Sequence, residues 1–125
     1  MIAGIKDMLI IATSEYIDQY QKLLGDGSQW KVKFSYEIQE DFGGIAEAFV
    51  IAEKFIGKDN VCLILGDNII YGNGLNKILK QCKKNQGATV LSYHVNDPHR
   101  FGVVEFDENN KVISIEEKQI GRAHV

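Results

Sequence analysis

The sequence predicts an α/β fold, with a mostly parallel sheet and an antiparallel hairpin near the C-terminal end. Short apolar runs alternate with segments whose apolar residues recur at helical spacing, which is the pattern of βαβ units. Two alternating segments then flank the turn-like sequence Asp107–Asn110, which is typical of a hairpin. A composition of 45% hydrophobic and 25% charged residues over 125 residues is ordinary for one globular domain.

The first predicted βαβ unit runs from a strand over residues 6–13 to a strand around Val32–Tyr36. The first strand contains an apolar run over residues 8–12, which is typical of a parallel strand buried on both faces. Between the strands, residues 14–24 carry apolar side chains at helical spacing. We expect Ser14 to cap this helix and the Gly25-Asp26-Gly27 sequence to end it.

The alternation continues along the middle of the chain, where Val61–Leu65 is the most apolar strand candidate. It ends abruptly in Gly66-Asp67-Asn68. The remaining predicted elements are helices over residues 45–56 and 74–85, a strand over 88–95, and hairpin strands over 102–106 and 112–115.

Charge and hydropathy argue against several classes of function. Fourteen basic and seventeen acidic residues give a formal net charge of -3 with no basic run, which is unsuited to wrapping nucleic acid. No apolar run reaches the roughly 18 residues of a membrane span, and the N-terminus lacks a signal-peptide layout. We therefore expect a cytoplasmic protein. Cys62 and Cys82 lack CxxC spacing and lie in apolar segments, so we expect two buried, reduced thiols.

Asp67 is a candidate metal ligand, because it follows the most apolar predicted strand. In open α/β sheets, ligands bind beyond the carboxyl ends of the strands. A carboxylate there can bind a hard cation such as Mg²⁺, with triphosphate oxygens completing the coordination shell, and this would support phosphoryl or nucleotidyl transfer. The alternative is that Asp67 forms a turn with Asn68 and only ends the strand.

The loop from Gln39 to Gly44 is a candidate base-binding site, because it lies between a predicted strand and a predicted helix. The Gln39 amide offers a donor and an acceptor, which suits the imide edge of thymine or uracil. Gly43 and Gly44 would let backbone N–H groups approach a ligand closely. A structural loop without ligand contacts is the alternative. The sequence contains neither a Walker loop nor a complete dinucleotide fingerprint.

Glu117 and Lys118, which follow the predicted hairpin, could bind a sugar phosphate. Glu117 would accept hydrogen bonds from sugar hydroxyls, and Lys118 would neutralise phosphate charge. A solvated strand end is the alternative interpretation.

Five segments, in matching order and spacing, resemble the glucose-1-phosphate thymidylyltransferase family of sugar nucleotidyltransferases. Together they extend the resemblance over practically all of residues 1–118. The segments are residues 21–28, Gln39 with residues 44–49, residues 65–72, residues 97–107 and residues 115–118.

The resemblance implies a Rossmann-like three-layer α/β/α nucleotidyltransferase core with a mostly parallel sheet and an antiparallel hairpin. It also implies an enzyme that joins dTTP to glucose 1-phosphate and releases pyrophosphate, in dTDP-rhamnose and surface polysaccharide biosynthesis. The full-length family forms homotetramers. By motif match, the implied site residues are Gln39 and Gly44 for the thymine base, Asp67 as a catalytic Mg²⁺ ligand, and Gly102, Glu117 and Lys118 for glucose 1-phosphate.

Two parts of the family pattern are missing from this sequence. The Gly-rich loop that grips the triphosphate would precede Met1, and the second metal carboxylate would lie beyond residue 118. We therefore expect residues 1–118 to be a central part of a nucleotidyltransferase domain, truncated at both ends and inactive alone. Residues 120–125 show no structural periodicity and match a translated sequencing adapter, so we expect a non-native tail over residues 119–125.

Three alternatives stay open at this point. The first is a related enzyme that uses UTP or another hexose 1-phosphate, because uracil and thymine differ by one methyl group. The second is a non-enzymatic flavodoxin-like or receiver-type domain, although Thr13-Ser14 stands where a receiver would carry an acidic pair. The third is an inactive or regulatory remnant of an enzyme.

Overall fold

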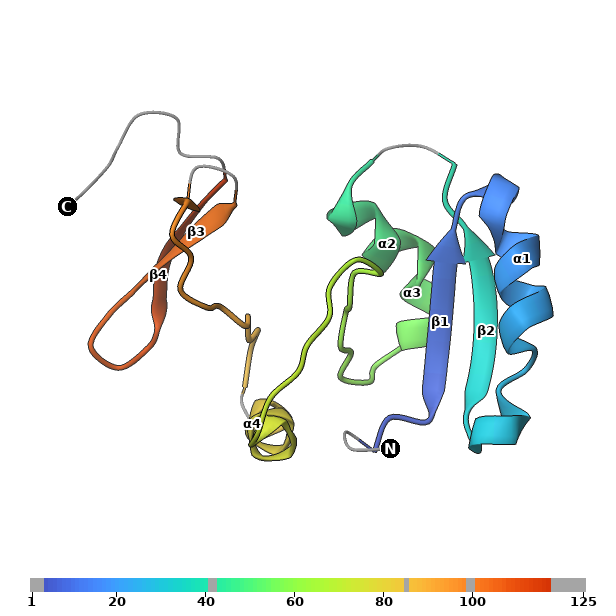
Figure 1. Ribbon diagram of the computed structural model, residues 1–125, viewed down its shortest axis with the longest axis horizontal. Coiled ribbons are helices and arrows are strands. Elements are labelled where there is room, and N and C mark those ends of the chain that lie inside the picture. Colours follow the sequence, from blue (N-terminus) through green and yellow to red (C-terminus); the bar gives the residue numbers. More distant parts are fainter. Residues whose placement is uncertain (1–3, 41–42, 85, 99–100, 118–125) are drawn as a thin grey trace. The chain divides into compact units, whose positions relative to one another are not determined.

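The computed structural model describes residues 4–40, 43–84, 86–98 and 101–117. These residues belong to two compact units, Met1–Asn85 and Gln86–Val125 (Figure 1). The predicted extent of one domain over residues 1–118 stays a prediction.

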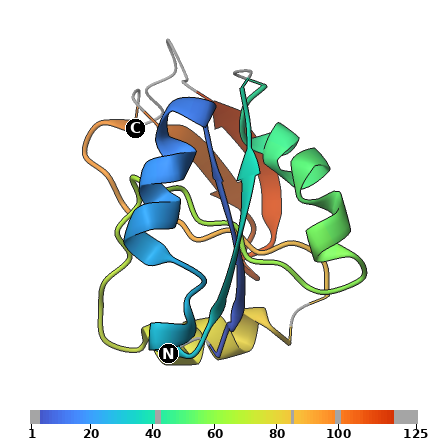
Figure 2. The ribbon, with the colours of Figure 1, turned by 90° about the vertical axis from the view of Figure 1, so that its right-hand side faces the viewer.

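The first unit is built around two parallel strands, β1 (Asp7–Ala12) and β2 (Lys33–Ile38). Their register pairs the first residue of each strand and continues to Ala12 opposite Ile38, so both carboxyl ends reach the same edge. Helix α1 (Ser14–Leu24) makes the crossover. Figure 2 shows α1 on one side of the strands, and the later helices α2 and α3 on the other. The predicted parallel βαβ unit is confirmed.

The ends of α1 differ in part from the prediction. Thr13, and not Ser14, is the N-cap residue, with extended φ and ψ of -69° and 159° and no side-chain capping bond. At the other end, Gly25 has a φ of 59° and its N–H donates to Gln21 O, as expected for a glycine that ends a helix. Ser14 is already inside the helix because the chain leaves β1 one residue earlier than the sequence suggested.

The predicted helix over residues 45–56 is divided at Ala52 into α2 (Ile45–Ile51) and α3 (Glu53–Ile56). Ala52 has φ and ψ of -81° and 0°, outside the α-helical region. Its side chain is only 8% exposed. Hydrogen bonds of the helical type still span the division, from Ala52 N–H to Ala48 O at 2.9 Å and from Ile56 N–H to Ala52 O at 2.8 Å, so the predicted helix is present as two adjoining pieces.

Helix α4 (Leu75–Cys82) is shorter than the predicted helix over residues 74–85. Gly74 precedes it in the left-handed region, with a φ of 87°, and serves as the N-cap. The prediction that both cysteines are buried is wrong, since Cys62 is exposed and Cys82 is partly exposed. Both cysteines are free.

The segments over residues 61–65 and 88–95, which were expected to be strands, form no β-ladder in the described part of the chain. In the first of them, Val61 is 50% exposed and Ile64 is 61% exposed. A strand requires a neighbouring backbone that accepts and donates its hydrogen bonds, and β1 pairs only with β2 among the described residues. The expected burial of Val61–Leu65 is therefore wrong.

The second unit contains the predicted hairpin, which joins β3 (Gly102–Phe106) to β4 (Val112–Glu117) in antiparallel register. In the turn, the Asp107 carboxylate accepts hydrogen bonds of 2.9 Å from the N–H groups of Asn109 and Lys111. A register shift between Glu105 and Phe106 marks a bulge next to this turn. The hairpin prediction is confirmed.

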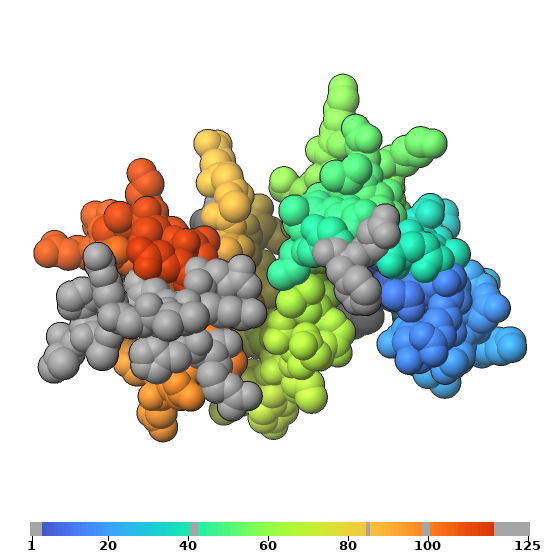
Figure 3. All heavy atoms as spheres, turned by 90° about the horizontal axis from the view of Figure 1, so that it is seen from above, coloured from blue at the N-terminus to red at the C-terminus, as the bar shows by residue number. Residues whose placement is uncertain are grey.

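Few apolar side chains are buried in the described structure. The buried ones are Ile17, Val32 and Ala52, with 5%, 9% and 8% exposure. Many large apolar residues remain exposed in the described part of the chain. Figure 3 shows the heavy atoms of the first unit, with the region of α2 and α3 in green at its surface. In the part of the chain that the structure describes, no helix has the length and apolar character to cross a membrane.

Candidate functional site

A pocket of about 460 Å³ lies in the first unit, at the carboxyl ends of the two parallel strands. Its apolar lining comes from β1, from the start of α2 and from residues 63–65. Its polar lining comes from Thr13, Gln39 and Glu40, and the backbones of Gly44 and Gly66 also border it. An apolar pocket with a few polar groups is the usual form of a small-molecule site.

Gln39 is held at this pocket by its backbone and by its side chain. Its N–H donates to Ala12 O at 3.0 Å and extends the β1–β2 ladder by one residue. Its side-chain Nε2 donates to Glu47 Oε2 at 2.7 Å and to Gly44 O at 3.3 Å. The structure thus brings together Gln39 and Gly44, the two residues expected at a nucleotide base.

Glu47 was not singled out in the sequence, although it contacts Gln39 directly. It lies in the first turn of α2, and its side chain is partly buried. A Cβ atom placed on Gly43 would come within 2.6 Å of Glu47 Cδ, so the carboxylate occupies space that only glycine leaves free. The sequence feature that could have identified Glu47 is an acidic residue in the first helical turn after a glycine-rich loop.

Thr13 is a second pocket residue for which the sequence pattern predicts no role. Its Oγ1 atom is buried, and no described residue forms a hydrogen bond with it. Thr13 lies between β1 and α1, at the same pocket as Gln39. A buried hydroxyl without a partner is rare, and a ligand or water molecule can satisfy it.

Asp67 lies next to the pocket residue Gly66, and its side chain is exposed. The backbone N–H of Asn68 donates to Leu65 O at 3.0 Å, which forms a turn around Gly66 and Asp67. The turn is thus present, and it leaves the Asp67 carboxylate accessible. The described residues contain no group of three or more His, Cys, Asp or Glu side chains able to hold a metal ion.

The residues expected at the sugar phosphate belong to the second unit. Gly102 opens β3 and stands opposite Glu117, the last residue of β4, in the hairpin register. Two of the three expected residues are therefore neighbours on the backbone. Lys118 lies outside the described residues.

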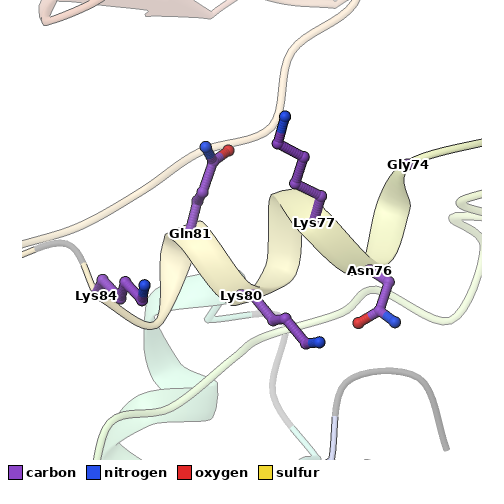
Figure 4. A pocket seen from close by; sticks show the side chains of 6 residues that line it. All are labelled: Gly74, Asn76, Lys77, Lys80, Gln81 and Lys84. Atoms are coloured by element: carbon purple, nitrogen blue, oxygen red, sulfur yellow. The ribbon is translucent and has the colours of Figure 1, made fainter.

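A second pocket, of about 560 Å³, lies along α4. Three lysines line it, together with Gly74, Asn76 and Gln81. Figure 4 shows Lys77 and Gln81 on one side of the helix, with Asn76 and Lys80 pointing to the other side. Because these side chains do not converge on a common point, we assign no ligand to this pocket.

Comparisons with known proteins identify the chain's relatives. It is 55% identical over 119 residues to a glucose-1-phosphate thymidylyltransferase of Neisseria gonorrhoeae, which covers 94% of this chain and 41% of the relative. A glucose-1-phosphate thymidylyltransferase of Xanthomonas campestris pv. campestris (strain B100) is 50% identical, with 94% and 40% covered. The chain thus spans about 41% of the length of the first of these relatives.

A solved structure shows the same fold. It is the crystal structure of a Bacillus anthracis protein assigned as a glucose-1-phosphate thymidylyltransferase, in complex with a sucrose. It matches this chain with a TM-score of 0.77 and 38% sequence identity. The match covers 88% of this chain and 44% of that one, and it confirms the predicted α/β nucleotidyltransferase fold. A family model described as nucleotidyl transferase matches residues 1–119. The chain therefore belongs to the nucleotidyl transferase family.

Proposed function

We propose that this chain provides the base-binding part of a glucose-1-phosphate thymidylyltransferase, which joins dTTP to glucose 1-phosphate and releases pyrophosphate. The observation that carries the proposal is the pocket that places Gln39 and Gly44 together at the carboxyl edge of β1 and β2. The names of the relatives from Neisseria and Xanthomonas support the substrate assignment.

The pocket's chemistry suits a pyrimidine base. Its apolar lining, from β1 and residues 63–65, offers contact to the faces of a planar ring. Gln39 and the Gly44 backbone offer polar groups at the edge of that ring. UTP is a second candidate substrate, because the thymine methyl group contributes selectivity of only about 1–3 kcal/mol in an apolar pocket.

A divalent cation is part of the proposed chemistry, and Mg²⁺ is the cation we propose. Asp67 would hold it, because its carboxylate is exposed beside the pocket residue Gly66. A single carboxylate fits Mg²⁺, which is usually bound by one or two carboxylates together with substrate phosphates and water. When bound, the cation would neutralise triphosphate charge.

In the proposed reaction, a phosphate oxygen of glucose 1-phosphate attacks the α-phosphorus of dTTP. The bond from the α-phosphorus to the oxygen that bridges to the β-phosphorus breaks in line, and pyrophosphate leaves with that electron pair. Gln39 and Gly44 would fix the base, and Gly102, Glu117 and Lys118 would hold the sugar phosphate. The residues thus contribute by positioning the two substrates, and the reaction needs no covalent enzyme intermediate.

We also propose where the enzyme acts, how it assembles and which residues belong to it. It would act in the cytoplasm in dTDP-rhamnose and surface polysaccharide biosynthesis, and the full-length protein would form a homotetramer. Residues 1–118 would be the nucleotidyltransferase part, and 119–125 a non-native tail. Membership of the nucleotidyl transferase family argues against a flavodoxin-like or receiver-type binding domain.

Base binding can be tested by saturation-transfer NMR, which detects weak complexes. We expect dTTP to receive saturation at its thymine protons from the 125-residue chain. Gln39→Ala should weaken binding about tenfold, because one hydrogen bond to the base is lost. Gln81→Ala, the same change on an exposed part of α4, is the control and should leave binding unchanged. Equal binding by both variants, or no transfer to dTTP from the folded chain, would contradict the proposed base site.

A further inference from the structure

The side-chain amide of Gln39 has both of its hydrogens engaged. Nε2 carries two hydrogens, and it donates to Glu47 Oε2 at 2.7 Å and to Gly44 O at 3.3 Å. Among the described residues, none donates to the Gln39 carbonyl oxygen, Oε1. The amide can therefore accept a hydrogen bond from a ligand, while it has no hydrogen left to donate.

We propose that Glu47 is a positioning residue that fixes the orientation of the Gln39 amide and thereby selects the base. With Oε1 accepting no hydrogen bond from a described residue, Gln39 recognises a pyrimidine that carries a hydrogen on ring nitrogen N3, as thymine and uracil do. In a ring whose N3 is an acceptor, the lone pair of N3 would face the lone pair of Oε1, and no hydrogen bond could form between them. This inference rests on the proposed function, because it assumes a pyrimidine base in the pocket.

Glu47 fixes the amide because a carboxylate accepts hydrogen bonds and donates none. If the Gln39 amide turned by 180°, its oxygen would face Glu47 Oε2, and two acceptors would repel each other at hydrogen-bond distance. Gly44 O, the second partner of Nε2, is also an acceptor only. Glu47 and Gly44 thus favour the same orientation of the Gln39 amide, with Nε2 toward them. The bond to the Glu47 carboxylate is the shorter of the two.

Gly43 keeps the Glu47 carboxylate in place by leaving room for it. A Cβ on Gly43 would come within 2.6 Å of Glu47 Cδ, and the flexible end of that side chain would have to move. Gly43 does not have a left-handed φ, so alanine fits its backbone. Gly43→Ala should therefore displace the carboxylate without removing it, and should reproduce the effect of Glu47→Ala.

The test compares two nucleosides that differ in the hydrogen-bonding character of N3. Deoxyuridine carries a hydrogen on N3, whereas the 2-pyrimidinone deoxyriboside has an acceptor there and a hydrogen in place of the C4 carbonyl. The effect of N3 is therefore read from the change in preference between the native chain and the variants, for which the C4 difference is the same. Dissociation constants come from NMR titration of the 125-residue chain. We expect the native chain to prefer deoxyuridine by about tenfold or more, the usual effect of matching one hydrogen bond and avoiding a mismatch.

In Glu47→Ala and Gly43→Ala, the freed amide can accept from deoxyuridine or turn and donate to the 2-pyrimidinone ring, so the preference should fall below about threefold. Glu53→Ala, which removes a carboxylate from the exposed first residue of α3, is the control and should keep the native preference. Glu47→Gln retains one acceptor oxygen and should give an intermediate preference.

A second readout needs no nucleotide. The side-chain amide protons of Gln39 should shift upfield in both Glu47→Ala and Gly43→Ala, because a short bond to a carboxylate moves an amide proton downfield. Glu53→Ala should not shift them. The backbone amide signals of the same spectra report whether each variant is folded.

The outcomes separate the inference from the proposed function. If deoxyuridine binds and the preference is unchanged in both Glu47→Ala and Gly43→Ala, the positioning role is wrong and the base site stands. If the Gln39 signals do not respond to Glu47→Ala, the fixed amide is also wrong. If neither nucleoside binds the folded native chain, the proposed base site fails and the selection of the base fails with it.

Discussion

At the scale of single residues, the turn between α1 and β2 shows how local chemistry stabilises the unit that carries the pocket. Asp26 Oδ1 accepts the Ser28 N–H at 2.9 Å, and the Tyr36 hydroxyl donates to Gly25 O at 2.6 Å. The first bond orders the turn itself, and the second ties the end of α1 to β2. The bonds of Asp26 and Tyr36 thus hold the turn and connect the end of α1 to β2. Gln39 follows directly after the last residue of β2.

The Asp26 carboxylate makes the stability of this turn depend on pH. Hydrogen bonds from the backbone and then the side chain of Ser28 lower the pKa of Asp26 from its ordinary value of 3.8. Because the folded pKa is the lower one, the stabilisation is complete above pH 3.8 and is lost as pH falls through the folded pKa. Asp26→Asn should flatten this acid dependence, as measured by urea unfolding from pH 6 down to about pH 2.

Asp18→Asn is the matched control for Asp26, since Asp18 is an exposed aspartate on α1 outside the turn. The Asp18 variant should keep the native pH dependence. An Asp26→Asn variant with an unchanged acid profile would show that the Ser28 bonds do not stabilise the folded chain.

Gly27 is required in the same turn for conformation and for space. Its φ is 85°, and a Cβ there would lie 2.8 Å from Val32 O and 3.0 Å from Phe34 Cδ2. Gly27→Ala should lower the free energy of unfolding by about 2–4 kcal/mol, from left-handed strain together with overpacking. Gly57→Ala, at a φ of 56° with open space around it, should lower it by only about 1–2 kcal/mol. Equal losses in urea unfolding would contradict the steric part of this explanation.

At the scale of elements, the structure separates segments that form by local interactions from those that need a partner. Helix α1 ends at its own glycine, Gly25, and the hairpin closes over the short turn around Asp107. Val61–Leu65 has the composition of a strand but no ladder in the described structure. Apolar character alone therefore does not make a strand, because a strand exists only through the backbone beside it.

The hairpin turn gives a prediction at this scale. The Asp107 carboxylate accepts two backbone N–H groups, and Asn110 follows with a φ of 60°. Asp107→Ala should destabilise the hairpin by about 1–2 kcal/mol, because two exposed hydrogen bonds are lost. Faster amide exchange across β3 and β4 would report this loss. Glu108→Ala, an exposed change in the same turn, should leave the exchange rates unchanged.

At the scale of the whole molecule, few apolar side chains are buried among the described residues, while many large ones are exposed. Ile69 and Tyr71, on the segment after the Asp67 turn, are 93% and 99% exposed. Exposed apolar surface of this extent favours association. The chain also spans only about 41% of the relative from Neisseria gonorrhoeae, so groups that the relative uses for catalysis can lie in the part that is not matched.

We therefore expect the 125-residue chain to release no pyrophosphate from dTTP and glucose 1-phosphate with Mg²⁺ present. The residues that we propose hold the base, the cation and the sugar phosphate, and none of them is assigned to the triphosphate, whose charge must also be stabilised during the transfer. A coupled pyrophosphate assay would check this, with the Neisseria gonorrhoeae relative as positive control. Robust release by this chain would show that its own residues complete the site.

The candidate site was predictable where its residues follow directly from the local pattern. Gln39 and Gly44 stand in a loop between a recognisable strand and a recognisable helix, and the structure places them together. Glu47 and Thr13 were not predicted, because their roles depend on which groups they face. An acidic residue in a helix and a threonine after a strand have no distinctive pattern in the sequence.

The sequence by itself determined the elements whose interactions are short in range. These are the parallel unit of β1, α1 and β2, the glycine that ends α1, and the hairpin of β3 and β4; the motifs shared with the family also lie in the sequence. The tertiary structure alone decided the missing ladder at Val61–Leu65 and the bond from Gln39 to Glu47. The physical reason is that periodicity and turn chemistry act over a few residues, whereas a ladder, a buried contact or a carboxylate facing an amide requires groups that only folding brings together.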